Sequence, residues 1–102
     1  MSVPKLNVVF SRRAARDVQN IQEYTLERWG KEQAAFYSEA MLDALLTLQT
    51  HPLLGTARDD LLSGVRSFHC ERHTIFYRVT GDDHYIHRVL HERANASPGE
   101  LS

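Results

Sequence analysis

The segment GVRSFHCERHTIFYR, residues 64–78, brings cationic and aromatic side chains together in a chain of nearly balanced charge. It contains three arginines and two histidines among two phenylalanines and a tyrosine. Guanidinium groups can stabilise the charge of a phosphate that is being cleaved, and a histidine with a pKa of about 6.5 can carry a proton. The same groups can instead receive acidic side chains of a partner, or cover an apolar strand with their stems while their heads stay in water. The segment alone leaves catalysis, partner binding and simple strand decoration open.

Cleavage of RNA without a metal needs a proton acceptor, a proton donor and cations that stabilise the phosphorane. The candidate cations are Arg66, Arg72, Arg78, Arg88 and Arg93. His91 is the one candidate acid or base in the last expected strand, and the alternative is a strand-end histidine bonded to the backbone. No tyrosine follows Tyr85, no lysine follows Lys31, and residues 94–102 carry Glu100 as their sole titratable side chain. The sequence therefore offers many cations but few groups that could move a proton.

Length and composition indicate one small globular domain. The chain has 102 residues, of which 42% are apolar and 25% are charged. A single cysteine, Cys70, excludes an intramolecular disulfide, and the N-terminal MSVPKLNVVF is too short an apolar run for a signal peptide. No stretch approaches the roughly 20 apolar residues that span a bilayer. We therefore expect a cytoplasmic protein that does not bind membranes.

The charged residues argue against general nucleic-acid binding, because the net charge is −1. Ten of the twelve basic residues are arginine, which suits forked contacts to anions, although an arginine-rich codon usage explains the same bias. His69 and Cys70 fall on opposite faces of a regular strand, and the chain has no second cysteine. We therefore expect no metal site and no cofactor.

The first half of the chain predicts one strand and two helices. Residues 5–10 read as a short strand, and Ser11 offers a hydroxyl that can cap a helix. The helix stripe consists of Ala14, Val18, Ile21 and Thr25, with Trp29 near it. Gly30 is suited to end this helix, and a second helix is predicted over residues 31–49 before the His51-Pro52 step. Two helices joined at one glycine form a hairpin whose apolar faces need a third surface to cover.

The second half predicts a connection and then three strands. Residues 52–63 contain turn residues, and the strands are expected at 65–70, 73–79 and 85–91 with short turns between them. The order is β-α-α-β-β-β, an α+β fold in which the helical hairpin packs on one face of a mainly antiparallel sheet and leaves the other face partly open. We expect a single domain over residues 1–93 and a flexible C-terminal tail over residues 94–102.

Strand alternation predicts which side chains share a face of the sheet. In the first strand of the meander, Arg66, Phe68 and Cys70 share a face. In the second strand, Thr74, Phe76 and Arg78 oppose His73, Ile75, Tyr77 and Val79. In the third strand, Tyr85, His87, Val89 and His91 oppose Ile86, Arg88 and Leu90. Each strand thus presents a ring together with a cation or a histidine, which a partner could contact.

The first helix carries cations in an unfavourable place. Arg12 and Arg16 lie four residues apart near the start of the helix, where they repel each other and oppose the helix dipole, and Asp17 relieves part of this through Arg13. An acidic partner segment that docks there would remove the conflict. Aromatic rings near the end of this helix have two interpretations, as core residues or as the wall of a groove for an amphipathic partner segment. These rings are Tyr24 and Trp29.

Several strings along the chain together resemble one protein family. They are ERWG at 27–30, HPLLG at 51–55, RDDL at 58–61, GVRSF at 64–68, RHTIFYRV at 72–79 and RVLHER at 88–93. In this order and spacing they resemble the ParE toxins of the RelE/ParE superfamily, from about Phe10 to Arg93. The resemblance implies the compact toxin fold, a toxin–antitoxin module with a ParD-like antitoxin, and inhibition of DNA gyrase by direct binding. The RelE branch of the superfamily instead cleaves messenger RNA on the ribosome.

We expect the ParE branch, because RelE-like enzymes use sheet lysines and a tyrosine or histidine near the C-terminus that this chain largely lacks. It is then not an enzyme, and it binds nucleic acid specifically only through its antitoxin. The residues expected to bind the antitoxin or the target are Arg12, Arg16, Tyr24, Trp29, Arg66, Arg78, Arg88 and Arg93. The alternative is a metal-independent endoribonuclease whose catalytic residues are Arg66, Arg78, His91 and Arg93. A third alternative is a degenerate toxin that survives as an antitoxin partner or co-repressor.

Overall fold

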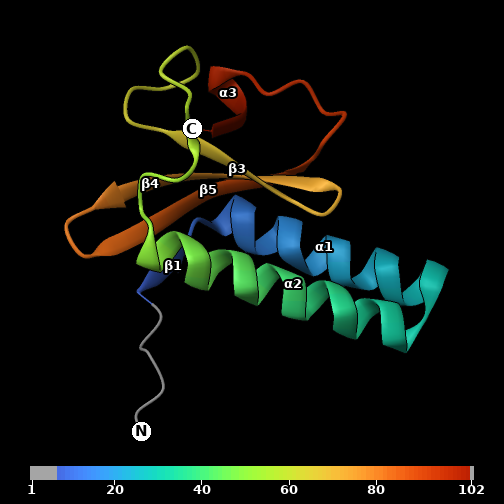
Figure 1. Cartoon of the computed structure of the whole chain (residues 1–102). Coiled ribbons are helices and arrows are strands. Elements are labelled where there is room, and N and C mark those ends of the chain that lie inside the picture. Colours follow the sequence, from blue (N-terminus) through green and yellow to red (C-terminus); the bar gives the residue numbers. More distant parts are fainter. Residues whose placement is uncertain (1–6, 102) are drawn as a thin grey trace, which may run out of the picture.

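The computed structural model describes residues 7–101 as a helical hairpin packed on one face of a five-stranded sheet (Figure 1). The helices are α1 (Arg12–Trp29), α2 (Lys31–Thr50) and the short α3 (Pro98–Leu101). The strands are β1 (Val8–Phe10), β2 (Thr56–Ala57), β3 (Arg66–Cys70), β4 (His73–Thr80) and β5 (Asp83–His91). The predicted α+β fold is confirmed. Lys5 and Leu6 of the first predicted strand lie outside the described residues, and β2 lies within the predicted connection.

The strands follow the order β1-β5-β4-β3-β2 across the sheet. β1 pairs in parallel with β5, and the other neighbours are antiparallel. The predicted meander is closed by two-residue turns, Glu71-Arg72 between β3 and β4 and Gly81-Asp82 between β4 and β5. Glu71 and Gly81 have positive φ angles of 55° and 62°, as tight hairpin turns require. The end of β3, the start of β4 and the end of β5 therefore lie side by side.

Residues at their ends explain why the two helices start and stop where they do. The Ser11 hydroxyl accepts a hydrogen bond from the Ala14 N–H at 2.9 Å and donates to the His87 carbonyl at 2.7 Å. It thus caps α1 and ties the helix to β5 at the same time. Gly30 separates α1 from α2 with a φ of 94°, in the region that favours glycine. Both predicted boundaries agree with the structure, and α2 extends one residue further, to Thr50.

Both faces of the sheet are covered, but by different parts of the chain. The main core lies between the helices and the sheet and includes Leu48, Tyr77 and Ile86. A smaller core on the opposite face is formed by Leu61, Val65, Phe76 and Leu101. The sequence predicts that this second face is partly open and that the tail is flexible. In the structure α3 lies against the sheet on the side away from α1 and α2, and Leu101 is only 4% exposed (Figure 1).

The face alternation predicted for the last strand is wrong because β5 contains a β-bulge. Phe76 pairs with Arg88 whereas Tyr77 pairs with Ile86, so His87 is one extra residue in β5. The bulge inverts the alternation, and Ile86 therefore shares the main core with Val89 instead of opposing it. β1 pairs with β5 only as far as Ile86, so the part of β5 beyond the bulge has a free edge.

Candidate functional site

A groove with aromatic walls opens between the helical hairpin and the β3–β4 turn, with a volume of about 700 Å³. Its lining residues are Asn20, Ile21, Tyr24, Thr25, Trp29, Gln33, Phe36, Tyr37, Glu71, Arg72, His73 and His91. We call it the aromatic groove. Tyr24, Trp29 and Phe36 are 60%, 65% and 51% exposed, so these large rings are available to a partner. Of the two interpretations of Tyr24 and Trp29, the structure agrees with the groove wall and not with the core.

Three rings from α2, β4 and β5 meet at one end of the aromatic groove. The Tyr37 hydroxyl is hydrogen-bonded to His73 Nδ1, and the His73 and His91 rings meet edge to face with centroids 5.4 Å apart. Burial raises the pKa of Tyr37, and the charges of Cys70 and Glu71 add to this. Burial lowers the pKa of His73 below its ordinary value of 6.5, and a charge on His91 would lower it further. Both partners of the hydrogen bond are therefore neutral at pH 7.

His91 also has a backbone partner, because its Nδ1 accepts a hydrogen bond from the Arg93 N–H at 3.1 Å. This bond agrees with the interpretation of His91 as a strand-end histidine, although the side chain is exposed. The lone pair of Nδ1 is occupied by this contact, which leaves Nε2 as the nitrogen that faces solvent or a partner.

Two arginines predicted to bind a partner donate hydrogen bonds to the connection between α2 and β3 of the same chain. Arg66 donates from one guanidinium nitrogen to the carbonyls of Gly55 at 2.7 Å and Leu53 at 3.2 Å. Arg78 donates to the carbonyl of Ser63 at 2.6 Å. These partners are carbonyl oxygens and not carboxylates, so both guanidinium groups can still receive an acidic partner group.

Sequence reasoning missed Tyr77, which is fully buried and hydrogen-bonds to the connection after α2, the same segment that Arg66 contacts. Its hydroxyl accepts from the Gly55 N–H at 3.0 Å and donates to the Pro52 carbonyl at 2.8 Å. A β-carbon on Gly55 would lie 2.6 Å from this hydroxyl, so the site admits glycine alone without a shift. The pattern that could have identified this contact is a buried tyrosine in a central strand, because its hydroxyl must find a partner.

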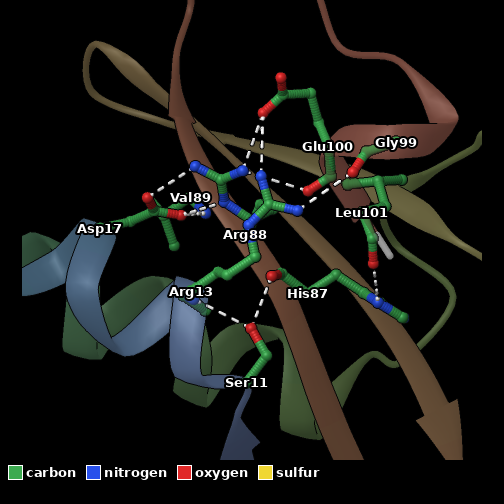
Figure 2. Close-up of polar contacts among 10 residues, drawn as sticks. Ser11, Arg13, Asp17, His87, Arg88, Val89, Gly99, Glu100 and Leu101 are labelled. Carbon is green, nitrogen blue, oxygen red and sulfur yellow. Dashed lines mark hydrogen bonds and ion pairs between the residues drawn. The ribbon is translucent and has the colours of Figure 1, made fainter.

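Arg88 is the most deeply engaged of the predicted arginines (Figure 2). Its guanidinium makes two bonds to the Asp17 carboxylate, at 2.7 and 2.9 Å, and a third to the Glu100 carboxylate at 2.8 Å. The Arg88 and Asp17 side chains are 13% and 14% exposed. Asp17 also accepts the Val89 N–H at 3.0 Å, on the edge of β5 that β1 leaves free. Arg88 thus joins α1, β5 and α3 inside the molecule.

The structure does not bring the four alternative catalytic residues together. Arg66 lies opposite Tyr77, whereas His91 lies opposite His73, four residues away along β4, which is roughly 13 Å. Arg78 alternates with Tyr77 and so lies on the other face of the sheet. Arg93 follows β5 beside His91 and is exposed. One phosphate cannot contact all four groups in this arrangement.

The remaining predicted residues, Arg12 and Arg16, are exposed on α1 at the far end from the aromatic groove. No helix within residues 7–101 is long and apolar enough to cross a membrane. In the same part of the chain, no group of three or more His, Cys, Asp or Glu residues is placed to hold a metal ion.

Comparison with known proteins identifies the family of this chain. The model of the family described as ParE toxin of type II toxin-antitoxin system, parDE, matches residues 8–96. Toxin ParE1 of Caulobacter vibrioides is 40% identical over 86 residues, which cover 84% of this chain and 88% of that protein. Toxin ParE1 of Mycobacterium tuberculosis is 35% identical over 86 residues, covering 83% and 88%.

A solved structure, described as a chromosomal ParDE TA system from P. aeruginosa, has the same fold with a TM-score of 0.69. It is 24% identical in sequence, and the match covers 84% of this chain and 95% of that one. The family indicated by the sequence strings is thus confirmed by the family model and by close relatives. The chain belongs to the ParE toxins of type II toxin–antitoxin systems.

Proposed function

We propose that this toxin acts by binding DNA gyrase rather than by catalysis, and that a ParD-like antitoxin neutralises it by direct binding. The observation that carries the proposal is the aromatic groove, in which Tyr24, Trp29 and Phe36 expose about half or more of their surface. Exposed rings that surround a hollow are typical of a protein–protein contact. The dispersion of Arg66, Arg78 and His91 supports a binder over a nuclease.

In this proposal the antitoxin places an amphipathic helical segment in the aromatic groove. Its apolar side chains pack on Trp29 and Tyr24, and a carboxylate at one end of the segment lies near Arg72 and His91. A second, acidic stretch of a partner binds at the exposed Arg12 and Arg16. Its carboxylates relieve the repulsion between these two cations, which are four residues apart in the free toxin.

The antitoxin contact is tested with a matched pair of α1 variants. Trp29→Ala removes a groove ring, whereas Leu26→Ala removes an apolar side chain that is 49% exposed on the same helix but does not line the groove. If Trp29 anchors the interface, its loss costs about 2 kcal/mol or more, so that the antitoxin Kd rises roughly 30-fold. Leu26→Ala should leave the Kd within about twofold. Equal Kd values for the two variants would contradict the groove as the antitoxin site.

The target is tested with purified gyrase. Excess toxin should inhibit supercoiling, and equimolar antitoxin should restore it. Unaffected supercoiling at excess toxin argues against gyrase as the target. In the same series, His91→Gln should stay fully toxic and transcripts in a translating extract should stay intact. Cut transcripts, together with a harmless His91→Gln that still binds antitoxin, would instead support the endoribonuclease.

A further inference from the structure

The C-terminal segment is held on the sheet in the way that a bound peptide is held by a receptor (Figure 2). Three successive backbone carbonyls each accept a hydrogen bond from a different side chain of α1 or β5. Gly99 accepts from Arg13 at 3.0 Å, Glu100 from Arg88 at 3.1 Å and Leu101 from a ring nitrogen of His87 at 3.1 Å. These contacts involve only backbone atoms of the segment and therefore do not depend on its side chains.

Two further contacts select side chains. The Glu100 carboxylate lies 2.8 Å from Arg88 and 3.5 Å from Arg13, so that two guanidinium groups face one acid. The next side chain, Leu101, enters the small core on the sheet face opposite the helices. We call this site the C-terminal cradle, consisting of Arg13, His87, Arg88, Leu61, Val65 and Phe76.

The segment that fills the cradle is short, and Ala96 is the one residue in the described connection to it that packs against the small core. Residues 92–95 between β5 and the segment are exposed, and α3 is only four residues long. Leu101 is the single side chain of α3 that is fully buried, and Glu100 is 43% exposed. The polar part of the cradle, Arg13, His87 and Arg88, belongs to α1 and β5, which also pack together in the main core. Its apolar part, Leu61, Val65 and Phe76, shares the small core with Leu101.

The charge around the cradle exceeds what the segment supplies. Arg12, Arg13, Arg16 and Arg88 bring four positive charges to this end of α1 and β5, whereas Asp17 and Glu100 bring two negative ones. Arg16 follows Arg13 by three residues and so lies beside it on the helix surface. A ligand with an additional acid would therefore gain attraction that the chain's own segment does not provide.

We propose that the C-terminal cradle is a second binding site, for a partner peptide in which an acidic residue directly precedes an aliphatic one and further acids flank the pair. The chain's own Glu100-Leu101 occupies the cradle until such a peptide displaces it. The apolar part of the cradle lies on the sheet face opposite the main core, and none of the cradle residues lines the aromatic groove, so the inference does not rest on gyrase or on the antitoxin groove.

Binding is measured by fluorescence anisotropy with a labelled, amidated peptide that has the sequence of residues 94–101 preceded by two glutamates. The intact toxin is compared with a double variant, Glu100→Gln and Leu101→Ser, whose segment no longer fits the cradle. The double variant should bind the peptide at least tenfold more tightly than the intact chain. A control peptide that carries the same two changes should not bind, and Arg13→Gln in the double variant should weaken binding several-fold.

Equal binding to the intact chain and the double variant, or no preference over the control peptide, overturns the proposal. A measurement on the unaltered protein removes any dependence on variant folding. With excess peptide, the Leu101 methyl resonances of the intact toxin should move from positions shifted by the Phe76 ring toward random-coil values. Unmoved resonances at saturating peptide show that the segment is a permanent part of the fold, and the cradle is then not a binding site.

Discussion

Replacing Arg88 by methionine tests whether this arginine is an internal anchor or a docking residue. Methionine keeps much of the apolar stem, so the change mainly removes the charge and its bonds. Arg88 loses two bonds to the Asp17 carboxylate, at 2.7 and 2.9 Å, and its contact with Glu100. The Asp17 side chain is only 14% exposed and is left as a poorly compensated anion.

The expected loss is about 3 kcal/mol in the free energy of unfolding. Removing one partner of a buried ion pair costs about 3–5 kcal/mol. We take the lower end because Asp17 keeps its bond from the Val89 N–H at 3.0 Å. The contact with Glu100 adds little, since that carboxylate is 43% exposed and salt bridges near the surface contribute less than about 1 kcal/mol.

Equilibrium urea unfolding at pH 7 measures this loss, with Arg12→Met as a control for removing an exposed arginine of the same chain. The control should change the free energy by no more than about 0.5 kcal/mol. A double-mutant cycle with Asp17→Asn should recover a coupling of about 1–3 kcal/mol, because the two residues are in direct contact. If Arg88→Met is as stable as Arg12→Met but no longer binds antitoxin, the internal role is refuted and the docking role predicted from the sequence is restored.

Three further perturbations follow from the contacts described above. Gly55→Ala places a β-carbon 2.6 Å from the buried Tyr77 hydroxyl and should lower stability by about 1–3 kcal/mol in thermal unfolding. Ser11→Ala removes the cap of α1 and should cost about 1 kcal/mol in the same assay. Burial lowers the pKa values of His73 and His87 below 6.5, so each ring must gain a proton on unfolding in acid. Their stabilising contribution is complete above pH 6.5 and is lost as pH falls through the lowered pKa values. The urea concentration at the unfolding midpoint should therefore decrease between about pH 7 and 5. The decrease should be smaller in His87→Gln, which lacks one of the two rings.

Local sequence patterns were sufficient to predict the helices and the meander. The hydroxyl of Ser11 and the positive φ of Gly30 act within a few residues of the boundaries they determine, so periodicity and capping rules apply to them directly. The turn at Gly81 closes a loop of two residues and is equally local. The same reasoning indicated that Tyr24 and Trp29 could wall a groove, but it could not choose that role over a core position, because exposure depends on what the sheet covers.

The contacts that sequence patterns could not predict are those between distant segments. Arg88 and Asp17 are 71 residues apart, and nothing near either residue indicates the pairing. The small, polar residues 94–102 resemble a flexible tail in composition, yet a single leucine at 101 finds an apolar socket on the sheet. The bulge in β5 also lacks a local pattern, since His87 is neither glycine nor part of a turn.

The bulge has consequences that reach both candidate sites. With one extra residue at His87, the side chains of His87 and Arg88 can both reach the C-terminal segment, while Val89 returns to the main core. Because β1 stops pairing at Ile86, the Val89 N–H needs another acceptor, and Asp17 of α1 provides it. Together with the bond from Ser11 to the His87 carbonyl, this contact holds α1 on the sheet. The same helix carries Arg13 of the cradle near its start and rings of the aromatic groove near its end. One irregular residue in β5 thus helps to position a helix that contributes to both proposed surfaces, and it also explains why the regular face alternation predicted for β5 failed.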